Sequence, residues 1–133
     1  MIVKYSVIPL VVDEVNLGLN SITIGEETYF PASNIAKTFG YSNPSQTIKT
    51  NVSDCNIKTV SELINLVKTM SIASMPDIDA IFTTEIDKLL TNINIHPNNA
   101  IKFTTTFISE SGLYELLYKT NKDFAAKAVN ILI

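Results

Sequence analysis

The side chains that could carry out chemistry gather between residues 33 and 52, and they are amides, hydroxyls and amines. Pro44 to Asn51 has the pattern of a helix whose outer side presents Gln46, Lys49 and Thr50 at helical spacing. Such groups on one side of a short helix can hydrogen-bond base edges and phosphate oxygens. The spacing therefore indicates a surface for nucleic acid, and it is equally typical of the polar side of a surface helix.

A shorter helix is expected just before this one, so that the two form a helix-turn-helix-like pair. Ser33 or Asn34 can cap its start, and Gly40 can end it. Asn43 then offers a cap for the second helix, which in a helix-turn-helix lies in the major groove. The usual spacing is matched only in part, because Gln46 stands where an apolar residue is expected. A plain helical hairpin fits the pattern equally well.

No constellation typical of catalysis is found along the chain, which has no phosphate-cradling glycine loop and no nucleophile elbow. One expected helix carries the acidic cluster Asp77, Asp79, Glu85 and Asp87. Its spacing lacks a calcium-loop pattern, so we interpret it as a solvated helix face. The sequence predicts that the protein is not an enzyme and binds no cofactor.

The single cysteine and the single histidine set a further limit. Cys55 is expected to be a packed small side chain, and His96 an exposed loop residue. Together they cannot supply the ligands of a transition-metal site, so no metal is expected. An unpaired cysteine also fits a reducing compartment.

Composition restricts how the chain could recognise a partner. All ten basic residues are Lys, and the formal net charge is −3. Without Arg, the bidentate guanidinium contact to guanine is not available, so a nucleic-acid contact must use Lys, amides, hydroxyls and backbone N–H groups. The 18 Ile and 13 Asn are residues of A/T-rich codons, a bias that we interpret as the genome composition of some large DNA viruses and parasites.

With 133 residues, of which 46% are hydrophobic, the chain is expected to fold as one domain. Its longest early apolar run, Tyr5 to Val12, is too short to span a bilayer and is interrupted by Pro9. No secretory signal is recognised. We therefore expect an intracellular protein with no membrane contact, in the host nucleus or cytoplasm if it is viral.

Periodicity predicts an α+β fold, with a small antiparallel sheet and several short packed helices around the helix-turn-helix-like pair. Strand signals occur at residues 2–8, at 20–30 with a turn at Gly25, and at 101–107, whereas 9–19 is ambiguous. Thr59 and Glu62 form a capping box before a helix that ends in the break at 71–76. Further helices are expected at about 77–91, from Ser109 or Ser111 to about 120, and from Asn121 onward.

Two parts of the chain resemble one known family. They are Tyr29 to Ile48, and Phe107 to Leu117 followed by Lys122 to Val129. Both resemble the N-terminal domain of the BRO family, the baculovirus repeated-ORF proteins and their relatives among phage antirepressors. Gly40-Tyr41 with Asn43-Pro44, followed far downstream by Ser111 to Tyr114, is the specific combination. Within a BRO-like domain of residues 1–133, the segment at about 59–99 is interpreted as a divergent helical insertion, and Asn34 stands where the family generally has Asp.

The resemblance implies a DNA-binding module of a viral regulatory protein, with RNA as the open alternative. The expected contacts are Gln46, Lys49 and Thr50 toward the groove, Ser42, Asn43 and Ser45 toward phosphate, and Lys37 toward the backbone. Residues 28–58 contain three lysines and one aspartate, which is a small surplus of positive charge. Binding is therefore expected to be weak and strongly salt-dependent, and to be assisted by homodimerisation or by a C-terminal part of a longer protein.

The competing interpretation is a protein-interaction module without direct DNA contact. Antirepressor relatives engage a repressor, and an acidic helix with an apolar C-terminal end suits a repressor or host protein as partner. A DNA-binding domain should present a positive face on the helix at Gln46 to Thr50. An interaction module should instead present an apolar patch.

Overall fold

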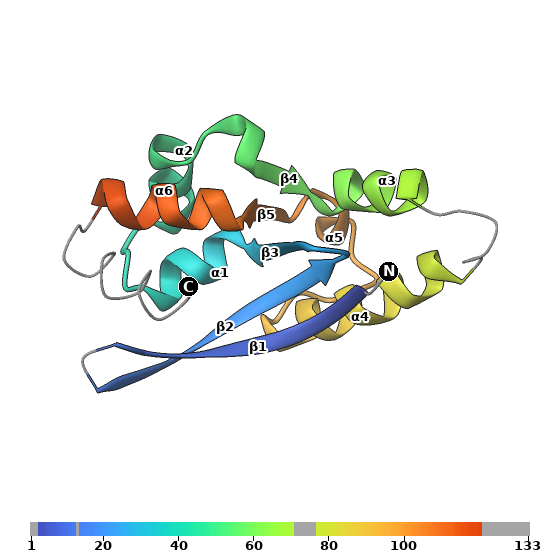
Figure 1. Ribbon diagram of the computed structural model, residues 1–133, viewed down its shortest axis with the longest axis horizontal. Coiled ribbons are helices and arrows are strands. Elements are labelled where there is room, and N and C mark those ends of the chain that lie inside the picture. The colour runs from blue at the N-terminus through green and yellow to red at the C-terminus, as the bar shows by residue number, and fades with distance from the viewer. Residues whose placement is uncertain (1–2, 13, 71–76, 121–133) are drawn as a thin grey trace.

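The computed structural model describes residues 3–12, 14–70 and 77–120, which form the expected α+β fold (Figure 1). The sheet is antiparallel and has the order β1-β2-β3-β5-β4. Its strands are β1 (Val3–Val12), β2 (Val15–Ile24), β3 (Glu27–Pro31), β4 (Ile57–Thr59) and β5 (Thr106–Ser109). The helices are α1 (Ala32–Thr38), α2 (Pro44–Asn51), α3 (Val60–Met70), α4 (Ile78–Asn92), α5 (Ile101–Thr104) and α6 (Glu110–Thr120), with a 3-10 turn at Asp54–Asn56.

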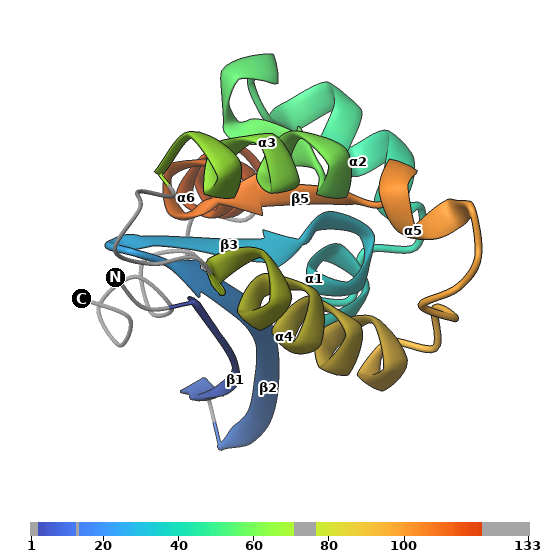
Figure 2. The ribbon, with the colours of Figure 1, turned by 90° about the vertical axis from the view of Figure 1, so that its right-hand side faces the viewer.

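Two apolar cores lie on opposite faces of the sheet. Neighbouring residues of a strand point to opposite faces, and Tyr29 belongs to one core whereas Phe30 belongs to the other. Residues of α1, α2 and α6 close the core around Phe30, and residues of α3 and α4 close the core around Tyr29. Figure 2 looks onto α3 and α4, with α6 behind them.

The β1–β2 hairpin is longer than the strand signals indicate, because residues 9–19 extend both strands. The N–H of Tyr5 points away from β2 and donates to Oε1 of Glu85 at 3.4 Å. Pro9, four residues later on β1, faces the same free edge of the sheet. A proline there removes no hydrogen bond to β2, and an edge strand therefore tolerates it.

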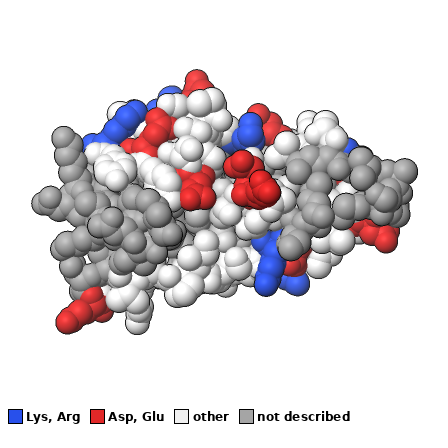
Figure 3. Space-filling view, viewed as in Figure 1, with Lys and Arg blue, Asp and Glu red and all other residues white. Residues whose placement is uncertain are grey.

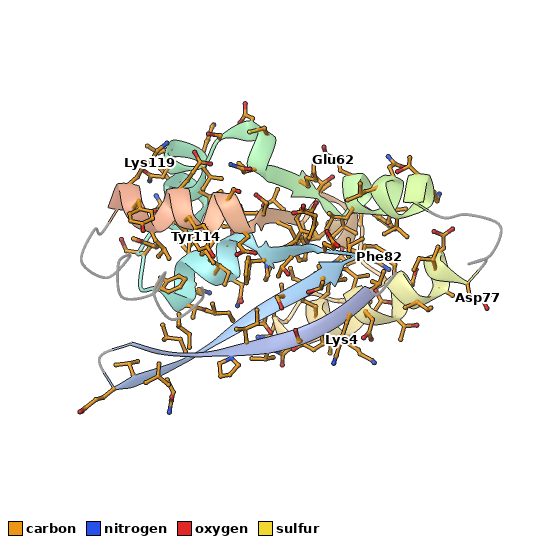
Figure 4. The ribbon with its side chains drawn as sticks, viewed as in Figure 1. Lys4, Glu62, Asp77, Phe82, Tyr114 and Lys119 are labelled. Carbon is orange, nitrogen blue, oxygen red and sulfur yellow. The ribbon has the colours of Figure 1, made fainter. Side chains whose placement is uncertain are left out.

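The segment 59–99 supplies much of the core around Tyr29. Its expected capping box is confirmed: Thr59 N–H donates to Oε1 of Glu62 at 3.1 Å, and Glu62 N–H donates to Oγ1 of Thr59 at 3.2 Å. The helix expected at 77–91 is confirmed as α4, and its Phe82 is buried between the helix and the sheet (Figure 4). That this segment is an insertion relative to the family stays a prediction.

The strand expected at 101–107 is wrong over its first half, where α5 forms a single helical turn. Local hydrogen bonds explain the difference. Asn99 Oδ1 accepts from the N–H of Ile101, and the Thr105 hydroxyl donates to the Ile101 carbonyl at 2.8 Å. Such side-chain bonds to the backbone stabilise a turn in competition with a strand. The alternating Ile101 and Phe103 remain 55% and 47% exposed, so no core contact favours the extended form.

Cys55 is also placed differently from the expectation. It lies in the 3-10 turn and is exposed, not packed, because this turn follows α2 at the surface. His96 is an exposed loop residue, as expected. The helix expected after Ser109 is confirmed as α6, whereas the break at 71–76 and the helix expected from Asn121 onward lie outside the described residues.

Candidate nucleic-acid interface

The first helix of the pair begins without the expected side-chain cap. Strand β3 ends at Pro31, and α1 follows directly with Pro31 as its N-cap residue and no capping hydrogen bond from a side chain. Ser33 is exposed, and Asn34 turns inward, where its Oδ1 accepts a hydrogen bond from the Asn20 amide at 3.0 Å. The prediction that Ser33 or Asn34 caps the helix is therefore wrong, because the chain enters α1 before it reaches either residue.

Asn34 instead joins a polar network inside the molecule. Asn20 is buried, with only 8% of the residue exposed. Its Oδ1 accepts hydrogen bonds from the Tyr5 hydroxyl at 3.2 Å and from the Asn92 amide at 2.6 Å. A buried amide with all these partners holds its neighbours in one arrangement. This network fixes α1 to strand β2 and to α4, and thereby sets where the helix pair sits on the sheet.

The turn between α1 and α2 is formed as the sequence indicates. Gly40 has φ of +88°, its N–H donates to the Lys37 carbonyl, and the N–H of Tyr41 donates to the Ala36 carbonyl, both pairs at about 3 Å. These two bonds make a Schellman motif, in which a residue with positive φ ends a helix. The chain therefore leaves α1 sharply and begins α2 within a few residues.

The second helix has the expected bounds, with Pro44 at its first position. Asn43 is the N-cap residue, as expected, but its side chain makes no capping hydrogen bond, and its carbonyl accepts from the Thr47 N–H and hydroxyl. Ile48 is 5% exposed and packs in the core around Phe30, which turns Gln46 outward. The helix-turn-helix-like pair is thus anchored through Ile48, two residues later than the usual pattern.

All seven residues expected to contact nucleic acid are exposed: Lys37, Ser42, Asn43, Ser45, Gln46, Lys49 and Thr50. The Gln46 amide donates to the Thr50 hydroxyl at 3.0 Å, so these two groups already share one hydrogen bond. Lys37 and Lys49 form no ion pair within the described part of the chain. The segment 59–99 leaves the outer side of α2 open to solvent.

A carboxylate that the sequence did not single out holds the far end of α2. Glu115 on α6 accepts hydrogen bonds from the Ser53 hydroxyl at 2.6 Å, the Asn56 amide at 2.6 Å and the Ser53 N–H at 3.1 Å. These hydrogen bonds lower the pKa of Glu115 to about 2, and the bond from the Ser53 hydroxyl has the largest effect. The Lys119 ammonium at 3.6 Å makes a smaller contribution. Lys119 itself projects from the end of α6 (Figure 4).

Gly112 allows α6 to approach this loop closely. A Cβ at Gly112 would lie 3.1 Å from Cβ of Asn56 and 3.2 Å from both Cβ of Ile108 and Cγ1 of Val52. Its N–H donates to the Ser109 hydroxyl, which in turn donates to Oδ1 of Asn56. The Ser109 to Glu115 stretch thus has a structural role, since it fixes the chain that leaves α2.

A groove with a volume of about 500 Å³ lies beside the helix pair. Ser33 and Lys37 of α1 and Ser45 of α2 line it, together with Ile95, Ile101 and further residues between 93 and 106. Lys37 and Ser45 belong to the expected contact set, whereas Ser42, Asn43, Gln46, Lys49 and Thr50 lie outside the lining. The sequence carries no signal for this groove, because α5 comes next to α1 only in the tertiary structure.

Two ion pairs elsewhere on the molecule involve carboxylates of α4. Lys88 pairs with Glu85 at 2.7 Å and lowers the pKa of that carboxyl, and Lys102 pairs with Asp87 at 2.9 Å. Among the described residues, no group of three potential ligands could hold a metal ion. The face seen in Figure 3 mixes acidic and basic side chains and has carboxylates near its middle. That face offers no continuous basic surface.

These features define an α+β domain that carries a helix-turn-helix-like pair on one face of a small antiparallel sheet. The family model of the BRO family N-terminal domain matches residues 19–133, and the chain therefore belongs to the BRO family. This places it among domains of a regulatory, nucleic-acid-binding type in general. Comparison with curated proteins and with solved structures finds no match. Within the described residues, no helix is long and apolar enough to cross a bilayer.

Proposed function

We propose that this domain binds DNA through the outer side of α2, weakly and with strong salt dependence. One observation carries the proposal: Lys37 and Lys49 stand exposed and without ion pairs on the helix pair in the described part of the chain. The amides and hydroxyls of Asn43, Ser45 and Gln46 lie on the same element or directly before it. Phosphate contacts from two lysines give low affinity, and the remaining groups can approach base edges.

The test is an anisotropy titration with a labelled duplex at about 50 mM salt, the range in which phosphate contacts are strong. We expect Lys49→Glu to weaken binding by about tenfold, because it loses one phosphate contact and adds a repulsive charge. The slope of log K against log salt should fall by about one unit. Lys68→Glu makes the same charge change at an exposed position of α3, away from the helix pair, and should leave affinity nearly unchanged.

Three results would contradict the proposal. They are an absence of binding at low salt, an equal loss from Lys68→Glu and Lys49→Glu, and a salt slope that Lys49→Glu does not alter. A matched RNA duplex distinguishes the two nucleic acids, since the deep, narrow major groove of RNA excludes a helix that B-DNA accepts. DNA should therefore bind more tightly than RNA of the same sequence.

A second candidate function is a protein interface on the β1–β2 hairpin. Val7 and Val11 are 48% and 50% exposed on one side of β1, and Pro9 between them is exposed as well. The far end of the hairpin extends away from the helices in Figure 1. The residue at this end, Glu14, is acidic, which suits a protein partner better than a phosphate backbone.

A further inference from the structure

The groove beside the helix pair has a lining of two kinds. Ser33, Lys37, Ser45 and Thr106 supply three hydroxyls and one ammonium group. Among the described residues none of these four side chains has a hydrogen-bond partner or an ion pair. Ile93, Ile95 and Ile101 supply the aliphatic part of the lining. Four unused polar groups, all able to donate, favour an anionic oxygen, and the isoleucines favour a flat or apolar group attached to it.

We propose that this groove receives one unpaired nucleotide, with its phosphate toward Lys37 and the hydroxyls and its base or sugar toward the isoleucines. The proposal rests on the proposed function and adds a second site to it. A groove of about 500 Å³ has the size of small-ligand pockets and cannot admit a duplex. The nucleotide can belong to a single-stranded or gapped part of the bound DNA, or it can be a free nucleotide.

The position of the groove connects it to the DNA-binding side of α2. Ser45 lies on the first turn of α2 and Lys37 near the end of α1, and both line the groove while remaining exposed. A strand whose phosphates follow α2 can therefore pass into the groove without leaving the helix pair. Since isoleucine side chains make no hydrogen bonds to base edges, the groove should accept different bases with little preference.

The single turn of α5 provides two positions for a matched pair of test variants. Ile101 lines the groove and Phe103 does not, although both are about half exposed on α5. Ile101→Glu places a carboxylate in the groove, and Phe103→Glu adds the same charge two residues away outside it. Neither change removes a buried side chain, so both variants should fold.

The experiment measures the affinity of the unsubstituted chain and of both variants for two DNA ligands. One is a blunt duplex, and the other is the same duplex with a one-nucleotide gap. We expect the gapped duplex to bind about tenfold more tightly than the blunt one, because it gains one charge-assisted phosphate contact and one apolar contact with the isoleucines. Ile101→Glu should abolish this preference and leave blunt-duplex affinity close to that of Phe103→Glu. Titration with a free deoxynucleoside monophosphate, followed by the isoleucine methyl signals in NMR, tells whether a free nucleotide also enters.

The outcomes separate this proposal from the proposed function. If the blunt duplex binds and the gap adds nothing, or if Ile101→Glu and Phe103→Glu act alike on the gapped duplex, the groove proposal is overturned while DNA binding by α2 stands. If neither duplex binds and the monophosphate leaves the isoleucine signals unchanged, both proposals fail. Methyl shifts with the monophosphate alone support a nucleotide groove that is independent of DNA binding.

Discussion

At the scale of single residues, Glu115 connects the family motif on α6 to α2, the helix for which we propose DNA binding. Its carboxylate accepts three hydrogen bonds from Ser53 and Asn56, which follow α2 directly. Hydrogen bonds to a charged group are among the stronger ones, so this side chain should stabilise the native state. The position of α2 thus depends on a residue more than sixty positions away in the sequence.

We predict that Glu115→Gln lowers the free energy of unfolding at pH 7 by about 1–2 kcal/mol, the lower part of the range for charged hydrogen bonds because the side chain is partly solvated. The folded pKa of about 2 lies below the ordinary value of 4.5. The contribution of Glu115 is therefore fully present above about pH 4.5 and is lost as the pH falls toward 2.

Urea unfolding measured from pH 7 to pH 2 tests this prediction. The unsubstituted chain should lose stability below about pH 4.5, and Glu115→Gln should lose less over the same interval because it has no carboxylate to protonate. Glu26→Gln, in the exposed turn between β2 and β3, serves as the control and should behave like the unsubstituted chain. Equal acid sensitivity of the Glu115→Gln variant would contradict the role given to this carboxylate.

At the scale of elements, the turn after α1 determines the direction of α2. Gly40 has φ of +88°, and a Cβ built on it would contact nothing within 4 Å. Any effect of a substitution there is therefore backbone strain and not a steric clash. The anchors of α2, namely Ile48 in the core and the Ser53 contacts to Glu115, then fix its other end.

We predict that Gly40→Ala destabilises the fold by about 1 kcal/mol, the cost of a left-handed conformation for a residue with a Cβ. Because asparagine tolerates this conformation better, Gly40→Asn should recover much of the loss. Thermal unfolding of the three proteins measures the difference. An alanine variant as stable as the unsubstituted chain would show that the turn does not require positive φ in solution.

At the scale of the whole molecule, the two proposed surfaces lie on different parts of the fold. The helix pair carries Lys37 and Lys49, whereas the β1–β2 hairpin carries exposed valines and an acidic end. Figure 1 shows α2 and the far end of the hairpin as separate projections. DNA binding and association with a second copy can therefore occur together, and the second would raise the affinity of the first through multivalency.

If the hairpin is such an interface, a charge on its exposed valine side should weaken self-association. We expect Val11→Asp to raise the dissociation constant of a homodimer by about tenfold or more, since it places a carboxylate in an apolar contact. Val15→Asp is the control, because Val15 is also exposed but lies on the other face of the hairpin. Sedimentation equilibrium measures both, and a monomer at all concentrations would exclude this interface.

Features that depend on near neighbours in the sequence could be predicted. The bounds of α2, the turn at Gly40 and the capping box of Thr59 with Glu62 are all confirmed. In each case the stabilising groups lie within one helical turn of one another. The exposure of the four expected contact residues on α2, Ser45, Gln46, Lys49 and Thr50, follows from helical periodicity, since Ile48 faces the core and the opposite side of α2 must face solvent.

Features that depend on distant partners could not be predicted. Asparagine is a residue type typical of a helix N-cap, but Asn34 accepts a hydrogen bond from Asn20 instead, because α1 begins two residues earlier, at Ala32. Ile101 and Phe103 alternate like a strand, yet Asn99 and Thr105 hold the segment in a helical turn. The groove and the Glu115 contacts join segments that are far apart in the chain. Periodicity and capping patterns report only on near neighbours, so they could not predict these contacts. The sequence by itself thus determined most of the helices and the polar side of α2. Only the tertiary structure decided the helical turn at α5 and which of these groups share a site, because both depend on contacts that no local pattern contains.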